Sequence, residues 1–275
     1  MHFDKGSGFW FVTSHAGCAA ALSDSRFSAS LGQRERIRDD QLPASMLTSD
    51  PPDHARLRGP GALILGPAAL RQQQGAFDDA ARRVVGELAG RDEAEATADI
   101  GEPFAVEVFA SLLALPAGRK AAFRDLARRV SVNLDPMAGP VVGARGRAAV
   151  GEFSEFTDQH IEFLREAGAD CPLTRLAGDR RLTRDEMLGI VSLAVVGGFL
   201  PLADLIGHAA HWTGAAGTTL ACLTAGDAGL AVDELMRLAT PIPFTARVTS
   251  QDTELDGVRL APGSRVLLLT AAANR

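Results

Sequence analysis

The sequence predicts a single domain over residues 1–275 that is mainly α-helical and carries a small antiparallel β-sheet. Two observations predict this class. Segments with apolar residues three and four apart recur through most of the chain, and β-prone runs lie near its two ends. In addition, residues 187–203 contain no charged side chain and are apolar on every side, which is typical of a helix that runs through a core.

Composition narrows the class of function. Hydrophobic residues make up 46% of the chain, which is enough for a sizeable core. The net charge of −6 and the pI near 5.5 argue against a nucleic-acid partner, because phosphate contacts need a concentrated basic face. Three isolated cysteines suit a reducing compartment, and the first residues show no export signal. We therefore expect a cytoplasmic protein with no membrane span.

The N-terminal region predicts one strand and one helix. Residues 9–12 are aromatic and β-branched and read as a strand, and residues 14–22 read as a short helix with Ser14 as its cap. The polar segment 23–49 is too long for a simple connection. We expect it to be a binding loop or a lid.

The sequence Asp-Pro-Pro-Asp at residues 50–53 predicts the end of the preceding segment and the start of a new helix. Proline fixes φ and excludes the preceding residue from the helix, whereas Asp53 can cap the helix that begins after it. We expect a short helix from His54 that ends by Gly59 and Pro60.

Further amphipathic helices come next in order. They are predicted over residues 67–88, with Pro67 in the first turn, and over residues 104–115, 119–132 and 145–167. A Pro/Gly loop is expected between the last two, at residues 133–143.

The central helix is predicted over residues 183–212. Thr183 and Glu186 form a capping box at its start. Gly197, Gly198 and Pro201 weaken its middle, since each glycine costs about 1 kcal/mol against alanine and proline about 3 kcal/mol. Such a weak point predicts a place where the backbone opens and a flat ligand approaches closely.

The C-terminal region returns to strands. Residues 230–239 predict an amphipathic helix that Pro241 stops. Three β-prone runs at residues 244–250, 254–260 and 265–270 are separated by turn signals. We expect these runs to pair as the small antiparallel sheet.

Five motifs in order resemble a bacterial, actinobacterial-type cytochrome P450. They are DPPDHARLR (50–58), LTRDEMLGIVSLAVVGGFLPLADLIG (182–207), DELMR (233–237), PFTAR (243–247) and ELDGVRLAPGSRVLLLTAAANR (254–275). The resemblance implies a cytochrome P450-like fold and a haem b cofactor. It also implies monooxygenation of a small hydrophobic, secondary-metabolite-like substrate, with electrons from NAD(P)H through a ferredoxin or flavodoxin.

The resemblance implies roles for individual residues. His54, Arg58 and Arg247 match the family's ligands of the haem propionates, and fixed cations suit two carboxylates on an apolar disc. Glu234 and Arg237 match its structural ExxR pair. The cofactor and substrate cavity would be lined by Val196, Gly197, Gly198, Phe199, Leu200, Leu202, Pro243 and Phe244.

Two departures from the family limit this expectation. The family's cysteine ligand of the haem iron lies in a loop beyond the last motif, and the three cysteines here lack that context, so we identify no metal ligand and expect a C-terminally incomplete chain. The family's acid and threonine beside the iron are replaced by Leu200 and Pro201, neither of which can relay a proton. We identify no catalytic residue and expect this chain to be inactive as an oxygenase.

Two alternatives to a fragment of an oxygenase remain open. One is a haem-free homologue that acts as an accessory protein and activator of a glycosyltransferase, and the other is a non-redox enzyme that uses the old pocket. The retention of His54, Arg58 and Arg247 argues against both, because bases that serve only haem propionates would be free to change.

Overall fold

A computed structural model describes residues 1–31, 45–131, 140–215 and 228–275. The chain forms two compact units, Met1–Asp39 with Asp204–Arg275, and Asp40–Ala203. The division falls inside the central helix, so each unit is described by itself. The prediction of a single domain stays a prediction.

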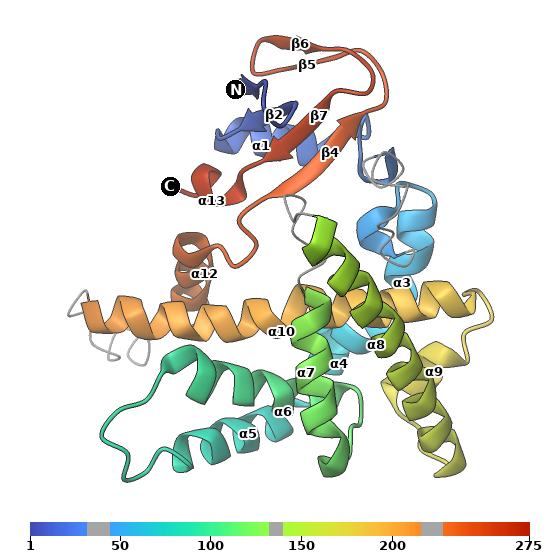
Figure 1. The fold of residues 1–275 in the computed structure, drawn as a ribbon, viewed down its shortest axis with the longest axis vertical. Coiled ribbons are helices and arrows are strands. Elements are labelled where there is room, and N and C mark those ends of the chain that lie inside the picture. The colour runs from blue at the N-terminus through green and yellow to red at the C-terminus, as the bar shows by residue number, and fades with distance from the viewer. Residues whose placement is uncertain (32–44, 132–139, 216–227) are drawn as a thin grey trace. The chain divides into compact units, whose positions relative to one another are not determined.

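The first unit is built on a five-stranded sheet with the order β1-β2-β7-β4-β3 (Figure 1). Its strands are β1 (His2–Asp4), β2 (Phe9–Val12), β3 (Phe27–Ser28), β4 (Thr245–Thr249) and β7 (Arg265–Leu268). Neighbouring strands are antiparallel except β2 and β7, which run parallel with Trp10 opposite Val266. The N-terminal and C-terminal strands predicted from the sequence therefore share one sheet, which the β-prone pattern did not reveal.

The run at 254–260 does not join this sheet. It forms a separate hairpin of β5 (Thr253–Leu255) and β6 (Val258–Leu260). Asp256 and Gly257 both have positive φ, at 49° and 77°, and this tight turn folds the run back on itself. The prediction that the run pairs with its neighbours was therefore wrong.

The first unit also contains helices before and after the central helix. They are α1 (His15–Ser23), α12 (Ala228–Ala239) and α13 (Thr270–Ala273). The predicted cap of α1 is confirmed, since the Ser14 hydroxyl accepts from the Gly17 amide at 3.1 Å. Ser14 also donates to Asp256 at 2.8 Å and so joins the helix to the hairpin. The predicted loop 23–49 contains β3, and most of its remainder, residues 32–44, lies outside the described residues.

The second unit is almost entirely helical. Its elements are η1 (Met46–Thr48), α3 (Asp53–Leu65), α4 (Pro67–Gln72), α5 (Gln74–Gly86), the π-helix η2 (Ala96–Gly101), α6 (Glu102–Leu112), η3 (Ala117–Arg119), α7 (Lys120–Ser131), α8 (Pro140–Glu166), α9 (Pro172–Ala177) and the first part of α10 (Arg184–Ala215). The predicted helices at 104–115, 119–132, 145–167 and 183–212 are confirmed. Helix α8 begins at Pro140, so the end of the predicted loop 133–143 is helical, and residues 132–139 lie outside the described residues.

Two predicted boundaries in this unit were wrong. Helix α3 continues through Gly59 and Pro60 to Leu65, and its N-cap is Pro52, whereas Asp53 lies in the first turn. Burial of Leu57, Pro60 and Ile64 stabilises the helix past the proline. The predicted helix 67–88 is two helices, α4 and α5, which meet at Gln73.

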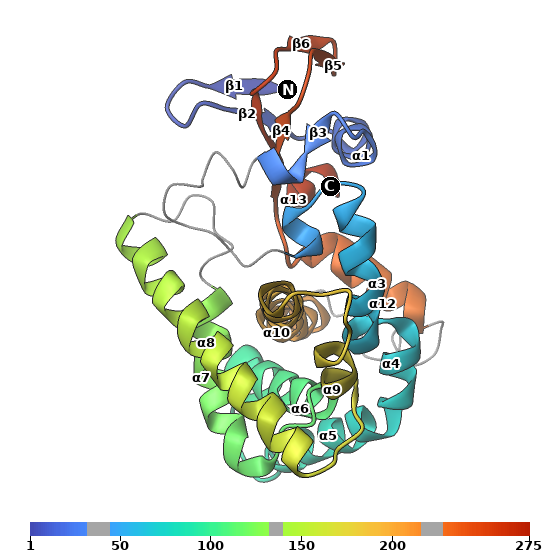
Figure 2. The same cartoon turned by 90° about the vertical axis from the view of Figure 1, so that its right-hand side faces the viewer.

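The N-terminal part of α10 runs through the middle of the second unit. Figure 2 shows it end-on, with α7 and α8 on one side, α3 and α4 on the other and α5 and α6 below. Phe199 of α10 is fully buried against Phe109 of α6 and Phe123 of α7, at ring-centroid distances of 6.3 and 5.9 Å. The prediction of a helix through a core is confirmed for this part of the chain.

One helix in the described part of the chain, Arg184–Trp212, is long and apolar enough to cross a membrane. Half of its most apolar window is buried inside the protein. A helix through a protein core meets the same criteria, so the feature is weak evidence for a membrane span.

Candidate functional site

Helix α3 presents two basic side chains that have no anionic partner among the described residues. His54 and Arg58 lie one turn apart on one face of the helix. His54 is half-buried and Arg58 is exposed. Within the described residues, neither side chain makes an ion pair or a hydrogen bond, although most arginines in this unit are paired. The pair is therefore open to an anionic ligand.

Arg247, the third predicted cation, lies on β4 in the other unit. Its Nη1 donates to the Thr245 hydroxyl at 3.1 Å and to the Ala246 carbonyl at 2.7 Å, and the side chain is half-buried. Pro243 and Phe244 precede this strand and are exposed and half-buried respectively. Because the units are described separately, a common site of these residues with His54 and Arg58 stays a prediction.

The two glycines in the middle of α10 have different surroundings. A Cβ added at Gly198 would lie 2.7 Å from Cζ of Phe109, whereas one added at Gly197 would meet only Leu193 of its own helix, at 3.8 Å. The small size of Gly198 thus has a packing reason, close contact of α10 with α6. Gly197 is the better candidate for the approach of a ligand, and a role of either glycine in cofactor binding stays a prediction.

The neighbouring residues of α10 also differ from one another in burial. Val196 and Phe199 are buried in the core, whereas Leu200 and Leu202 are half-buried at its edge. Helix α10 is continuous through Pro201, which leaves the Gly197 carbonyl without its usual helical donor. Of the predicted pocket residues in this helix, Leu200 and Leu202 are therefore the more accessible.

Glu234 and Arg237 form a bidentate ion pair on α12. Arg237 donates through Nε at 2.7 Å and Nη2 at 2.6 Å to the two carboxylate oxygens. The pairing lowers the pKa of Glu234 and raises that of Arg237. Arg237 also donates to the Asn274 carbonyl. Both side chains are about half exposed, at 55% and 43%, so this pair is not buried.

The described cysteines do not resemble a thiolate ligand. Cys18 is buried, and its thiol donates to the Val12 carbonyl at 3.6 Å. Burial raises its pKa, which disfavours the thiolate. Cys171 caps α9, with its sulfur 3.6 Å from the Thr174 hydroxyl. Cys222 lies outside the described residues.

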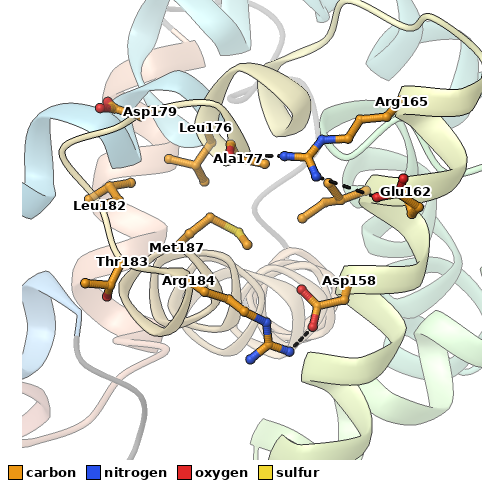
Figure 3. A pocket seen from close by; sticks show the side chains of 11 residues that line it. Asp158, Glu162, Arg165, Leu176, Ala177, Asp179, Leu182, Thr183, Arg184 and Met187 are labelled. Atoms are coloured by element: carbon orange, nitrogen blue, oxygen red, sulfur yellow. Dashed lines mark hydrogen bonds and ion pairs between the residues drawn. The ribbon is translucent and has the colours of Figure 1, made fainter.

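A surface pocket of about 380 Å³ lies between α8, α9 and the start of α10 (Figure 3). Its apolar floor contains Ile161, Leu176 and Met187. Charged side chains form the rim, where Arg184 pairs with Asp158 and Arg165 donates to the Ala177 carbonyl at 3.3 Å. The rim cations are thus already engaged with groups of the protein itself.

Sequence reasoning missed this pocket. Its lining comes from three elements whose charged residues each resemble a solvated face, and only their packing brings the apolar floor together. The predicted substrate-pocket residues are not among its lining.

Comparison with known proteins identifies the family of the chain. No family model matches it. The chain is 30% identical over 290 residues to nocardicin C N-oxygenase of Nocardia uniformis subsp. tsuyamanensis, covering 98% of this chain and 70% of that protein. It is 27% identical to cytochrome P450 monooxygenase PikC of Streptomyces venezuelae, covering 98% and 67%.

A solved structure shows the same fold. The structure of P450BioI in complex with a hexadec-9Z-enoic acid-ligated acyl carrier protein superposes with a TM-score of 0.87 at 24% identity, covering 97% of this chain and 72% of that one. The chain therefore spans about 70% of the length of the proteins that it matches. On this fold and these relatives, the chain belongs to the bacterial cytochrome P450 family.

Proposed function

We propose that the chain supplies the haem b-binding part of a monooxygenase that oxidises a small hydrophobic, secondary-metabolite-like molecule. The observation that carries the proposal is the pair of basic residues on α3, His54 and Arg58, which lie one turn apart and have no partner among the described residues. The relatives support the reaction class, since they include an N-oxygenase and a cytochrome P450 monooxygenase.

The chemistry of the donor set fits one end of the cofactor. Two basic side chains without an anionic partner in the described chain suit carboxylates, because both can donate hydrogen bonds and arginine offers planar bidentate donors. We assign His54 and Arg58, and by resemblance Arg247, to the haem propionates. Bound haem supplies the oxidising chemistry of the family.

The iron of the cofactor would have no fitting ligand among the described residues. Cys18 is a buried thiol with a raised pKa, and Cys171 is engaged in the cap of α9. Leu200 and Pro201 offer no group that holds or moves a proton in the middle of α10. The chain by itself is thus proposed to bind the cofactor's carboxylates without completing the oxygenation reaction.

The expected partners are consistent with the same assignment. A cytoplasmic ferredoxin or flavodoxin would deliver electrons from NAD(P)H, and the substrate would enter beside Leu200, one of the half-buried apolar residues of α10. The acidic net charge of −6 supports the absence of a nucleic-acid partner.

Haem titration tests this function. We expect the apoprotein to take up haem, and the His54→Ala/Arg58→Ala double variant and the Arg247→Ala variant to take it up more weakly, as measured by Soret absorbance. A spectrum of the reduced protein with carbon monoxide then reports whether a thiolate binds the iron. Unchanged uptake by the double variant would remove α3 from the cofactor site.

A second candidate function is that of a haem-free homologue that activates a glycosyltransferase, or of a non-redox enzyme that uses the cavity in which the family binds haem and substrate. The replacement of the acid and threonine by Leu200 and Pro201 favours it, because a protein without oxygen chemistry needs no proton relay. A colourless protein that takes up no haem and co-purifies with a glycosyltransferase would support the accessory role. Haem uptake that depends on His54 and Arg58 would argue against both forms.

A further inference from the structure

Arg56 lies between His54 and Arg58 in the sequence of α3, and its side chain is on the opposite face of the helix. A step of two residues turns about 200° around a helix, so Arg56 is on the side opposite His54 and Arg58. Unlike His54 and Arg58, Arg56 makes ion pairs and hydrogen bonds with other described residues. Its Nη2 and Nη1 donate to the two carboxylate oxygens of Glu186 at 2.5 and 3.2 Å, and Nη1 also donates to the Arg181 carbonyl at 3.2 Å.

Glu186 connects this arginine to the start of α10. One of its carboxylate oxygens accepts from the Thr183 amide at 2.9 Å in the capping box. The hydrogen bond from Arg56, with those from Thr183, lowers the pKa of Glu186 to about 2. The Glu186 side chain is only 14% exposed and remains charged at neutral pH, whereas the Arg56 side chain is 38% exposed. Arg56 therefore joins α3 to a fixed point, the first turn of the central helix.

Backbone hydrogen bonds hold the first turn of α3, since the His54 amide donates to the Asp50 carbonyl at 3.0 Å and the Arg56 amide donates to the Pro52 carbonyl at 3.2 Å. The helix is weaker after Arg56. Pro60 has no amide hydrogen, so the Arg56 carbonyl lacks its usual helical donor, and the adjacent Gly59 adds backbone freedom. The side chain of Arg56 supplies an external support just before this weak point.

We propose that Arg56 is a positioning residue for the cofactor's carboxylates. Its ion pair with Glu186 sets the rotation of the first two turns of α3, and this rotation directs His54 and Arg58 to one side. The inference rests on the proposed haem function, because that function assigns the haem propionates as the ligand of His54 and Arg58. Arg56 itself does not contact the cofactor.

A matched control exists on the same turn of α10. Arg184 pairs with Asp158 and so joins the start of α10 to α8 instead of α3. Removing Arg184 also loosens the start of α10 but leaves the support of α3 in place. The two variants therefore separate a general loss of stability from a loss of orientation.

The test compares two probes, ferric protoporphyrin IX and its dimethyl ester, titrated into the apoprotein and followed by Soret absorbance. The ester has the same apolar disc and lacks the charged carboxylates. We expect the unmodified protein to prefer the diacid. Arg56→Ala should weaken diacid binding about tenfold, as for other residues that orient a ligand group without touching the bound species. Binding of the ester should stay unchanged, and Arg56→Lys should restore part of the preference.

Other outcomes overturn the inference. If Arg56→Ala weakens the binding of both probes equally, or of neither probe, Arg56 has no positioning role. The control variant Arg184→Ala should keep the preference for the diacid over the ester. Should Arg56→Ala fail to fold, Glu186→Gln keeps a capping side chain and removes the charge, with the same expectation. If the His54→Ala/Arg58→Ala double variant keeps the diacid preference, the proposed function itself fails, which is distinguishable from failure at Arg56 alone.

Discussion

Helices α6 and α12 have similar lengths and each carries an acid paired with arginine, yet their surroundings differ. Helix α6 is enclosed, and Glu102 at its start has a side chain 7% exposed that pairs with Arg124 and Arg128 of α7. Helix α12 has no buried residue, and its Glu234–Arg237 pair lies within one helix. The same chemistry therefore anchors one helix in a core and contributes little to the other, because burial decides what loss of a partner costs.

The largest effect is expected at the enclosed pair. Arg124→Ala would leave the buried Glu102 carboxylate with Arg128 alone, at 3.4 Å. We expect a loss of about 3 kcal/mol in the free energy of unfolding, at the lower end for a broken buried ion pair, because Arg128 remains as a partner. Urea denaturation measures it. Arg82→Ala, which removes an exposed pair with Asp79, is the control and should cause no resolvable change.

The contact of α6 with α10 predicts a smaller loss. Gly198→Ala would place a methyl group 2.7 Å from Phe109, whose side chain is 2% exposed and cannot move aside. We expect destabilisation of about 2 kcal/mol from overpacking. The neighbouring Gly197→Ala has space for the methyl group and should instead stabilise the helix by up to about 1 kcal/mol. Thermal denaturation that shifts both variants in one direction would refute this distinction.

The contact of α6 with α8 predicts a pH dependence. The His160 ring is buried, with Nε2 2.9 Å from the Leu113 carbonyl just after α6 and Nδ1 without a partner among the described residues. Burial lowers the pKa of His160 below its unfolded value near 6.5, so the fold favours the neutral ring. Its contribution to stability is present above pH 6.5 and is lost as the pH falls through the folded pKa, by at most about 1.4 kcal/mol per pH unit.

Urea denaturation at pH 7 and at pH 5.5 measures this slope. His160→Phe removes the titrating group while keeping a ring between Phe156 and Phe163, so we expect a flatter dependence even if the variant is less stable at both pH values. The exposed His208 on α10 provides the control, and His208→Gln should keep the original slope. An unchanged slope in His160→Phe would assign the dependence to other groups.

The smallest effect is expected on α12. Glu234→Gln removes the charge of an exposed pair, and we expect no resolvable change in the midpoint of thermal denaturation. A loss as large as that of Arg124→Ala would show that α12 is anchored by its ion pair and would remove the contrast between the two helices.

Much of the helical pattern could be predicted because it is local. The capping box of Thr183 with Glu186 and the cap at Ser14 depend on residues three positions apart, and the structure confirms both. The end of the first helix after residue 53 could not be predicted this way. Gly59 and Pro60 are local breakers, but burial of Leu57 and Ile64 outweighs them, and burial depends on distant residues.

The candidate site was predictable only in part. The spacing of His54 and Arg58 places them on one face of a helix, which is a property of the sequence alone. Their lack of a partner within the described chain, and the engagement of Arg56 with Glu186, depend on residues far away in the sequence, 130 positions in the case of Glu186. The pocket beside Met187 likewise arises from three separate elements.

The mainly helical class, the apolar central helix and the family to which the motifs point could all be predicted from the order of residues, because they depend on periodicity and short-range spacing. The packing of Gly198 against Phe109, the burial of Glu102 and the exposure of the Glu234–Arg237 pair became known from the folded protein. Close contact and burial are set by neighbours far apart in the chain, which residue type and spacing do not specify.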